Sequence, residues 1–494
     1  MTKKNIVWVS SEVHPYAKTG GLADVVASLS LQQSKMGHNV SVIMPFYRQQ
    51  IADLNIKFNK KYDLLEVPFG FHTEWAQVLE HRVNKNLKFY FIEFDRFFDR
   101  PTLYDYNGSE YSDNGQRYIF FSRAAMETVK LLNIKADILH TNDWHSALCC
   151  VYLKSDLYSH LPQFKKCRSV LTIHNIGYQG RIDKSNMYWT NLGWEYFNFQ
   201  CLEYYDCINL LKGGILTADM VNAVSPTYAD EILSSEFSFG LDGPLRHCAS
   251  RGKLRGIING IDIERWDPTS DELIEANFSY RTITKGKAKC KADLQKDFNL
   301  PIRADIPLFG TISRLADQKG LDVLAKCLEK MLANNDIQFV LLGDGDDYLE
   351  KYFQYLRDRF PAKVGVYLGY NDKLAHEIEA GCDMFLMPSR YEPCGLNQMY
   401  SMRYGTVPIV RATGGLEDTV NCYSVEKISK ATGFKFYDLH LNALRNTIEW
   451  ACEVYLNKPK DFRKMQINGM KEDFSWQHTA KLYELLYEDA NRTI

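Results

Sequence analysis

Short apolar runs alternate with helical patterns along the first half of the chain. Ile6–Val9 is the first run, and a helical pattern through Leu29 follows it until Gly37 ends it. Further apolar runs, each separated by a helical stretch, lie at Val40–Met44, Leu87–Phe94, Ile138–His140, Val170–Ile173 and Met220–Val224. Strands that alternate with helices in this way predict a parallel sheet covered by helices on both faces.

The same alternation restarts after Asn299-Leu300-Pro301. A helical pattern covers Leu321–Met331, and the apolar runs are Leu308–Ser313, Phe339–Leu342, Val364–Leu368, Met384–Met387 and Val407–Val410. The polar stretch from Asn259 to Lys296 is predicted to be the crossover between the two series. We therefore predict two doubly wound α/β domains, 1–258 and 259–494. The pattern leaves open whether the last helix, through Tyr487, packs on the second domain or back on the first.

A short repeat supports this organisation. Thr19-Gly-Gly-Leu-Ala-Asp24 returns as Thr413-Gly-Gly-Leu-Glu-Asp418. Both copies follow an apolar strand and open a helix, which favours an internal symmetry over a chance match.

Composition and charge narrow the class of protein. With 494 residues, of which 45% are hydrophobic and 24% charged, the chain is long enough for two large domains and is not a disordered one. The net charge of −2 argues against a nucleic-acid partner, because a sequence-independent grip on DNA needs a basic surface.

The lengths of the apolar runs and the spacing of the cysteines indicate in which cellular compartment the protein works. The apolar runs are far shorter than the roughly 20 residues that span a bilayer, and Glu12 and His14 come too early for the apolar core of a signal peptide. The 12 cysteines lie between Cys149 and Cys452 without a CxxC motif, so we expect reduced, buried thiols. These features predict a cytoplasmic protein with no membrane partner, and nothing in the sequence specifies an oligomeric state.

A glycine turn near the N-terminus is the first candidate site. Lys18 precedes Gly20-Gly21, and the turn leads into a helix, where free backbone N–H groups and the helix dipole attract phosphate. A tight turn without a ligand would explain the glycines equally well. Neither a GxGxxG fingerprint directly after the strand nor a GxxxxGK[ST] loop occurs, which excludes a dinucleotide oxidoreductase and a P-loop NTPase.

Two cations define a second candidate site. Arg314 follows the strand Leu308–Ser313 and Lys319 precedes the next helix, so both lie at the carboxyl edge of the sheet, where open α/β folds bind ligands. Guanidinium and ammonium groups neutralise phosphate oxygens, and together they can hold a diphosphate without a metal. We interpret Asp344-Gly345-Asp346 as a turn at a strand end, so no metal site is predicted.

Further polar residues follow the predicted strands. Glu392, just before the Cys394-Gly395-Leu396 turn, is placed to accept hydrogen bonds from a sugar. Asp143 and His174 each lie at the carboxyl end of a strand in the first half and indicate the wall of a pocket. A nucleophilic role for Cys394 is rejected because no acyl-transfer triad accompanies it.

At these residues the chain resembles the bacterial glycogen synthases and plant starch synthases, which transfer glucose from ADP-glucose to an α-1,4-glucan. The resemblance rests on KTGGLADVV, SRLADQKG, PSRYEPCGLNQ and ATGGLEDTV in the family's order and spacing, with support from HTNDWHSAL, THNIGYQG and NGID. It covers essentially the whole chain. It implies the GT-B architecture, in which two Rossmann-like domains face each other across a deep cleft.

The resemblance also implies roles for single residues. Arg314 and Lys319 would hold the donor's phosphates, Glu392 the glucosyl ring, and His174 and Asp143 would lie near the reacting carbon, which makes these five the catalytic set. The implied substrate-binding residues are Lys18, Gly20, Gly21, Asp24, Asn175, Asn259, Tyr370, Cys394, Gly395, Leu396, Thr413 and Gly414, with Tyr370 stacked on the base. The broader group of retaining GT-B enzymes has a second glutamate where this chain has Tyr400.

The implied reaction retains the configuration of the transferred glucose. A double displacement would need a nucleophile beside the anomeric carbon, and Asp143 is the single weak candidate. We therefore predict a front-face reaction in which Arg314, Lys319 and helix amides stabilise the departing ADP, with no metal or other cofactor. Two alternatives stay open, a retaining GT-B transferase that uses UDP-glucose or another acceptor and a non-catalytic glucan-binding protein.

Overall fold

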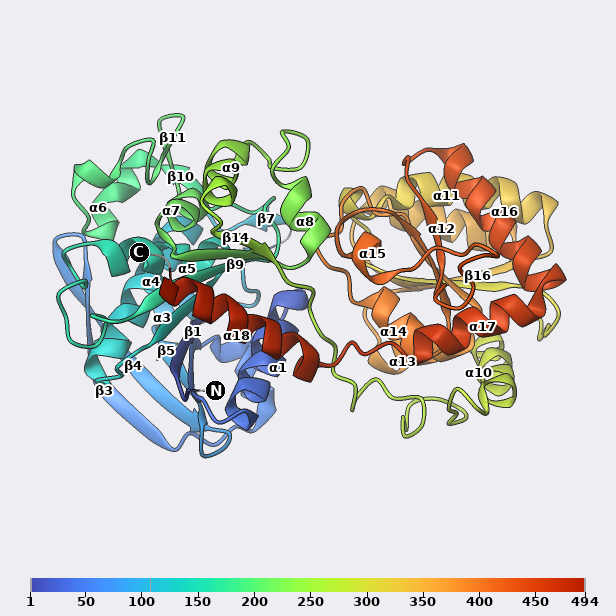
Figure 1. The fold of residues 1–494 in the computed structure, drawn as a ribbon, viewed down its shortest axis with the longest axis horizontal. Coiled ribbons are helices and arrows are strands. Elements are labelled where there is room, and N and C mark those ends of the chain that lie inside the picture. Colours follow the sequence, from blue (N-terminus) through green and yellow to red (C-terminus); the bar gives the residue numbers. More distant parts are fainter. Residues whose placement is uncertain (1, 107, 493–494) are drawn as a thin grey trace. The chain divides into compact units, whose positions relative to one another are not determined.

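The computed structural model describes residues 2–106 and 108–492, and the chain forms two compact units (Figure 1). The first unit comprises Met1–Gly260 and Trp476–Ile494, and the second comprises Ile261–Ser475. The chain leaves the first unit close to the predicted domain end at 258, and it returns to that unit for its last helix.

A nine-stranded sheet forms the centre of the first unit. In spatial order its strands are β14 (Leu254–Gly256), β13 (Met220–Ala223), β9 (Arg168–Ile173), β8 (Ile138–Asn142), β1 (Asn5–Val9), β2 (Asn39–Pro45), β5 (Leu87–Glu93), β4 (His72–Arg82) and β3 (Lys60–Phe69). The strands from β14 to β5 are parallel, as the alternation of strands and helices predicted. β4 is antiparallel to β5 and to β3, an addition that the sequence did not predict.

Helices cover both faces of this sheet. The longer ones are α1 (Gly21–Lys35), α4 (Asn114–Leu131), α5 (Asp143–Lys154), α7 (Leu210–Thr217), α9 (Asp242–Ser250) and α18 (Trp476–Arg492). α1 connects β1 to β2 and α5 connects β8 to β9, in opposite directions along the sheet. Right-handed crossovers therefore place α1 and α5 on opposite faces; α18 packs beside α1, and α4 and α7 pack beside α5.

Shorter elements complete the first unit. They are α2 (Arg48–Ile51), η1 (Ala52–Leu54), α3 (Asp95–Phe98), β6 (Asp105–Tyr106), β7 (Ser109–Glu110), β10 (Arg181–Asp183), η2 (Lys184–Asn186), α6 (Met187–Thr190), η3 (Trp194–Tyr196), β11 (Glu203–Tyr204), β12 (Cys207–Asn209) and α8 (Pro226–Glu231).

The C-terminal helix α18 docks on the first unit through polar as well as apolar contacts. The Tyr487 hydroxyl contacts His140 Nδ1 at 2.8 Å and accepts a hydrogen bond from the Gln33 amide at 2.9 Å. Asn222 Nδ2 donates to the Tyr483 hydroxyl at 3.1 Å. All of these side chains are buried, so α18 is an integral part of the first unit's core.

A six-stranded parallel sheet forms the centre of the second unit. In spatial order its strands are β17 (Val364–Leu368), β16 (Gln338–Gly343), β15 (Leu308–Ile312), β18 (Met384–Met387), β19 (Val407–Arg411) and β20 (Phe434–Phe436). The surrounding helices are α10 (Ile283–Asp297), η4 (Asp317–Lys319), α11 (Leu321–Asn334), α12 (Asp347–Arg359), α13 (Asp372–Gly381), α14 (Asn397–Arg403), α15 (Gly414–Thr419), α16 (Leu441–Asn457) and α17 (Pro459–Met470).

Helix α10 shortens the predicted crossover. The sequence assigned 259–296 to a connection because that stretch is polar and charged, but Ile283–Asp297 is helical and packs on α13. Its buried residues include Ile283, Cys290 and Leu294, a narrow stripe on an otherwise polar helix.

Two apolar clusters lie on the two faces of this second sheet. Alternate residues of β16 belong to different clusters, with Phe339 and Leu341 in one and Val340 and Leu342 in the other. This is the alternation that a strand buried on both faces requires.

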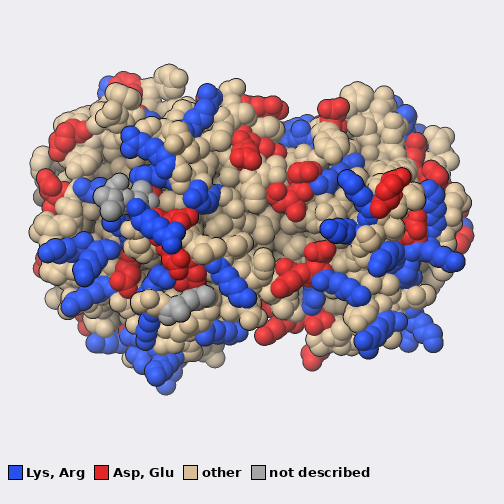
Figure 2. Space-filling view, in the orientation of Figure 1, with Lys and Arg blue, Asp and Glu red and all other residues tan. Residues whose placement is uncertain are grey.

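Charges of both signs are mixed on the surface. On the face shown in Figure 2, Lys and Arg side chains are interspersed with Asp and Glu side chains, in keeping with the net charge of −2.

All 12 cysteines belong to the described residues, and none of them forms a disulfide. Within the described ranges, no helix combines the length and the apolar content that crossing a bilayer requires.

Candidate active site

In the first unit, three predicted polar residues or segments follow neighbouring parallel strands. β9, β8 and β1 are adjacent in the sheet, and they lead into His174, Asp143 and the segment that contains Glu12. Because the carboxyl ends of parallel strands meet at one edge of a sheet, these residues lie at a common edge. The sequence predicted this position for His174 and Asp143 but not for Glu12.

Asp143 is held in an unusual backbone conformation at the start of α5. Its φ is +51°, a left-handed conformation that residues other than glycine rarely adopt. Its Oδ1 accepts hydrogen bonds from the backbone N–H of His174 at 2.7 Å and of Asn175 at 3.4 Å. Burial raises the pKa of Asp143 to about 7, although these two hydrogen bonds oppose the shift. The side chain is therefore protonated in a large share of molecules at neutral pH.

His174 is oriented by the residue before Asp143. Its Nε2 lies 2.9 Å from Asn142 Oδ1, and the Asn142 amide nitrogen donates to the Val9 carbonyl. An amide oxygen can only accept, so Nε2 carries the proton and Nδ1 is left as an acceptor. Burial lowers the pKa of His174 to about 3, which keeps the ring neutral at physiological pH.

Two predicted substrate-binding asparagines differ in their surroundings. The Asn175 side chain accepts from the backbone N–H of Gly177 at 3.0 Å. Asn259 is 5% exposed, and its Oδ1 has no donor among the described residues. Asn259 therefore retains an unused acceptor.

A buried carboxylate already occupies part of the N-terminal glycine turn. Glu12, 5% exposed, accepts from the backbone N–H of Thr19 at 2.6 Å, from the Thr19 hydroxyl at 2.7 Å and from the backbone N–H of Gly20 at 3.2 Å. The Tyr104 hydroxyl donates to the same carboxylate at 2.7 Å. Glu12 thus takes up two of the backbone N–H groups that the sequence assigned to phosphate, and the N–H groups of the first turn of α1, from Gly21 onward, are the ones that remain.

Lys18 lies at the exposed side of this turn. Its Nζ is 2.8 Å from Asp24 Oδ2, and both side chains are partly exposed, 43% for Lys18 and 25% for Asp24. The structure therefore brings these two predicted residues together as an ion pair that solvent can reach.

In the second unit, Lys319 contacts Glu392. The Lys319 Nζ is 2.7 Å from one carboxylate oxygen of Glu392 and 3.0 Å from the other, and the Ser389 hydroxyl donates to the same carboxylate at 2.8 Å. β15 and β18, which lead into the two residues, are neighbours in the sheet. Arg314 follows β15, is exposed, and makes no ion pair among the described residues. The predicted diphosphate and sugar residues of this unit therefore lie at one sheet edge.

Glycines lie at tight points of the two turns next to Glu392, and the first of these turns contains Gly414. A Cβ on Gly414 would lie 1.9 Å from the Glu392 carbonyl oxygen, and the φ of Gly414 is +45°. The backbone N–H of Gly415 donates to that carbonyl at 3.1 Å. Thr413 precedes α15 and is buried. The second glycine turn thus supports the segment that carries Glu392.

The turn after Glu392 is tied down by a glutamine. Gly395 has a φ of +72°, and α14 begins at Asn397, after Leu396. The Gln398 amide nitrogen donates to the carbonyls of Cys394 at 3.1 Å and Gly395 at 3.0 Å. Cys394 is buried at 5% exposure, which suits a structural thiol.

The predicted base-stacking residue is open to solvent. Tyr370 follows β17, is 75% exposed, and donates its hydroxyl proton to Asp372 at 3.0 Å. Tyr400, at the position of the second glutamate of the broader group, stacks instead on Trp266 at a ring distance of 4.0 Å. Tyr400 therefore has a packing partner in this chain.

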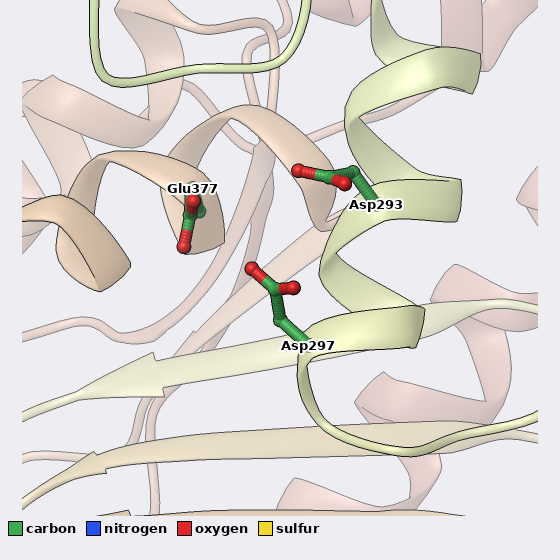
Figure 3. A group of neighbouring side chains, drawn as sticks. All are labelled: Asp293, Asp297 and Glu377. Atoms are coloured by element: carbon green, nitrogen blue, oxygen red, sulfur yellow. The ribbon is translucent and has the colours of Figure 1, made fainter.

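Acidic residues occur in two further places. Asp346 caps α12 by accepting from the backbone N–H groups of Tyr348 and Leu349, in agreement with its interpretation as a turn residue. Among the described residues, one group of three acidic side chains lies close enough to share an ion, Asp293 and Asp297 from α10 with Glu377 from α13 (Figure 3). Lys373 already pairs with Glu377 at 2.6 Å, and none of the predicted site residues belongs to this group.

Sequence reasoning missed the residues that hold these sites in place. Glu12, Asn142, Ser389 and Gln398 all bind backbone or side chains of predicted residues. Asn142 lies within the motif HTNDWHSAL, and Ser389 and Gln398 lie within PSRYEPCGLNQ. Their polar side chains inside these motifs were the signal by which the sequence could have identified them.

Comparison with known proteins identifies the family. Residues 5–247 match the family described as "Starch synthase catalytic domain", and residues 294–466 match "Glycosyl transferases group 1". A glycogen synthase 1 of Geobacter sulfurreducens is 43% identical over 99% of this chain and 96% of its own. A glycogen synthase of Thermosipho melanesiensis is 42% identical over 98% of each chain.

Solved structures agree with this assignment. The catalytic domain of starch synthase IV from Arabidopsis thaliana, bound to ADP and acarbose, has a TM-score of 0.89 and 31% identity and covers 99% of this chain and 100% of its own. A sucrose-phosphate synthase from Thermosynechococcus elongatus shares the fold, with a TM-score of 0.60 and 19% identity over 98% of each chain. The chain therefore belongs to the glycogen and starch synthase family of glycosyltransferases and has the GT-B fold, as its sequence motifs predicted.

Proposed function

We propose that this glycosyltransferase moves glucose from ADP-glucose to the non-reducing end of an α-1,4-glucan such as glycogen, with retention of configuration. The observation that carries the proposal is the contact between Lys319 and Glu392 beside the exposed Arg314, at one edge of a parallel sheet. This arrangement offers two cations for a diphosphate and one carboxylate for sugar hydroxyls. The relative from Arabidopsis thaliana, named as bound to ADP and acarbose, supports it.

Before the donor binds, the two proposed phosphate-binding cations, Arg314 and Lys319, differ in whether a carboxylate already pairs with them. Arg314 has no carboxylate partner in the described chain and can bind phosphate oxygens directly. Lys319 shares its charge with Glu392, so an incoming diphosphate competes for the ammonium group and frees Glu392 for the glucosyl ring. Both cations then stabilise the charge that develops on the departing ADP.

Asp143 supports the front-face route. A nucleophile for double displacement must be an ionised carboxylate, but burial raises the pKa of Asp143 to about 7 and its Oδ1 is engaged by the His174 backbone. We therefore assign Asp143 and the neutral His174 to orientation of the sugar, and the proton of the acceptor hydroxyl to the leaving phosphate oxygen.

We propose that Arg314 and Lys319 make a metal or other cofactor unnecessary, because the positive charge that a diphosphate leaving group needs is present in side chains. We also propose that the enzyme acts in the cytoplasm, since its 12 cysteines form no disulfide and such thiols persist in a reducing compartment.

One observation favours an alternative donor. Tyr370 is exposed and its hydroxyl is engaged by Asp372, so its ring offers a stacking surface that accepts uracil as well as adenine. UDP-glucose is therefore the second candidate donor.

The test measures incorporation of labelled glucose into glycogen from ADP-glucose and from UDP-glucose, each with and without a chelator. We expect ADP-glucose to be preferred and the chelator to have no effect. Arg314→Ala should abolish most incorporation, and Lys326→Ala, which removes an exposed lysine from α11, should leave it unchanged.

Three other results of this test would each overturn a different part of the proposal. Preference for UDP-glucose would replace the donor, loss of activity with chelator would establish a metal requirement, and glucan binding without transfer from either donor would establish a non-catalytic glucan-binding protein.

A further inference from the structure

The second unit contains a cavity of about 400 Å³ that the proposed reaction does not use. It is bounded by α10, by the loop that includes Ile302 and Asp305, and by the end of α16 with the start of α17.

This cavity lies at the opposite edge of the sheet from Arg314, Lys319 and Glu392. Its lining includes Ala304, which precedes β15, and Asp383, which directly precedes β18. These are the amino ends of the strands whose carboxyl ends lead to the proposed donor site. A strand of five residues spans about 16 Å, so a ligand in the cavity would not touch the donor site.

Two lysines of the lining are satisfied by the fold itself. Lys291 Nζ lies 2.7 Å from Asp383 Oδ2 and 2.6 Å from the Ile306 carbonyl. Lys287 Nζ donates to the Ala380 carbonyl at 2.8 Å and to the Thr406 hydroxyl at 2.7 Å. These ammonium groups add positive potential to the cavity but have few hydrogen bonds left to give.

Arg463 differs from these lysines, because its N–H groups find no hydrogen-bond acceptor among the described residues. Its guanidinium is half-buried in the cavity wall, and within the described chain it forms neither an ion pair nor a hydrogen bond; the Nη1 atom is shielded from solvent and unpaired. Burial lowers the pKa of Arg463, while Asp383 and Tyr455 oppose the shift. Arginine stays protonated in proteins, so a buried N–H group of this cation has no hydrogen-bond acceptor among the described residues, an arrangement that is costly when no ligand is bound.

The two carboxylates of the lining form their hydrogen bonds with groups other than Arg463. Asp383 is engaged by Lys291 and by the backbone N–H of Leu308 at 2.9 Å. Asp305 is exposed and pairs with Arg303 on the outside of the loop. The charge balance of the cavity is therefore positive at Arg463.

Apolar side chains form part of the wall beside Arg463. Ile302 and Leu456 are 63% and 55% exposed, and Phe462, which also lines the cavity, belongs to the buried core. Exposed aliphatic groups next to an unpaired guanidinium suit a molecule with one apolar and one anionic end.

We propose that this cavity binds a small organic oxyanion, with a carboxylate or phosphate group held by Arg463 and an apolar body lying against Ile302, Leu456 and Phe462. Planar guanidinium groups bind both oxyanions through two parallel hydrogen bonds. The site is independent of the donor site and of the reaction proposed above.

Calorimetric titration with phenyl phosphate and with benzoate tests the proposal, both in saturating ADP so that the donor site is filled. We expect one equivalent of at least one probe to bind, and its affinity to fall about tenfold or more in Arg463→Gln, the loss of one charge-assisted contact. Lys464→Gln, the exposed neighbour on the same helix, should bind like the wild type. Binding of one probe alone would tell phosphate from carboxylate recognition.

Thermal unfolding supplies an independent readout. Among the described residues Arg463 makes no hydrogen bond or ion pair that the substitution would remove, so Arg463→Gln should fold with a melting temperature close to that of the wild type. The bound probe should raise the melting temperature of the wild type and of Lys464→Gln but not of Arg463→Gln. The proposal is wrong if neither probe binds, or if binding is the same with and without the Arg463 guanidinium.

Discussion

The carboxylate of Glu12 holds the backbone of Thr19, which begins the turn into α1. A negative side chain of the protein thus sits where sequence reasoning placed a phosphate of the donor. The turn is shaped before any substrate arrives, and Lys18 projects from a fixed backbone.

Replacing this carboxylate should loosen the turn. In Glu12→Gln the amide nitrogen would face N–H and O–H donors, so at least one of the hydrogen bonds from Thr19, Gly20 or Tyr104 is lost. We expect kcat/KM for ADP-glucose to fall about tenfold or more, in line with the loss of charge-assisted hydrogen bonds. Steady-state kinetics check this, with the exposed Glu66→Gln as control; equal kinetics for both variants would contradict it.

The two glycine turns should respond differently to alanine. A Cβ on Gly414 meets the Glu392 carbonyl at 1.9 Å at a φ of +45°, whereas a Cβ on Gly20 meets nothing within 4 Å, and the φ of Gly20 is −150°. Gly414→Ala should lower the free energy of unfolding by about 1–2 kcal/mol from the backbone conformation alone, and the clash adds to this. Gly20→Ala should change it by less than about 0.5 kcal/mol. Urea unfolding of the two variants gives the comparison, and similar losses would refute it.

Asp143 should make stability depend on pH. Its pKa is about 7 in the folded protein against 3.8 as the ordinary value, so from about pH 4 to pH 7 the unfolded chain releases a proton that the folded protein keeps. Ionisation of the unfolded state therefore destabilises the wild type progressively over this range, and the effect levels off above pH 7. The stability of Asp143→Asn relative to the wild type should rise between pH 5.5 and 7 and then stay constant.

Denaturant unfolding at several pH values measures this difference. The exposed Asp53→Asn controls for the removal of any carboxylate. A stability difference for Asp143→Asn that is the same at pH 5.5 and pH 8 would show that the folded protein ionises Asp143 normally.

Substitution of the two cations proposed to bind the donor should have different effects on activity and on stability. Arg314→Ala and Lys319→Ala should each lower kcat by about 10²–10³, as deletion of one transition-state donor does. Arg314 is exposed and makes no ion pair in the described chain, so its removal should leave the melting temperature unchanged. Lys319→Ala should also lower the melting temperature, because it leaves the Glu392 carboxylate, whose side chain is 6% exposed, with the Ser389 hydroxyl but without its ion-pair partner. Turnover of Arg314→Ala within a few fold of the wild type would remove it from the catalytic set.

The docking of α18 should depend on one hydroxyl. Tyr487→Phe leaves the buried Gln33 amide and His140 Nδ1 without the partner at 2.9 and 2.8 Å. The free energy of unfolding should fall by about 1–3 kcal/mol. Leu485→Ala, at a site on the same helix that is 57% exposed, should cost less, and the reverse order would show that apolar contacts alone hold the helix.

The parts of the fold that could be predicted are those with strong hydrophobic patterns. β16 and β18 are buried on both faces, so their residues form continuous apolar runs. The exposed positions of β3 include Lys60 and Lys61, and those of β4 include His72 and Arg82, so the two strands resembled polar connections. α10 was missed for the same reason, since Lys dominates its exposed face.

For the site, sequence motifs predicted the residues but not their partners. Lys319 and Glu392 are far apart in sequence, and only the pairing of β15 with β18 brings them to 2.7 Å. Glu12 lies close to Thr19 in sequence, but its contact depends on how the chain folds back between them, which no periodicity encodes. That Arg463 Nη1 has no hydrogen-bond partner in the described part of the chain likewise follows only from three-dimensional packing.

The return of α18 to the first unit has a consequence for biosynthesis. A ribosome must complete residues 261–475 before it makes the helix that the first unit needs. In the nascent chain, the surface later covered by Tyr483 and Tyr487 is uncovered while the second unit is already free to fold. The unit whose synthesis begins first is thus completed only after the second unit has been made, because it lacks α18 until then.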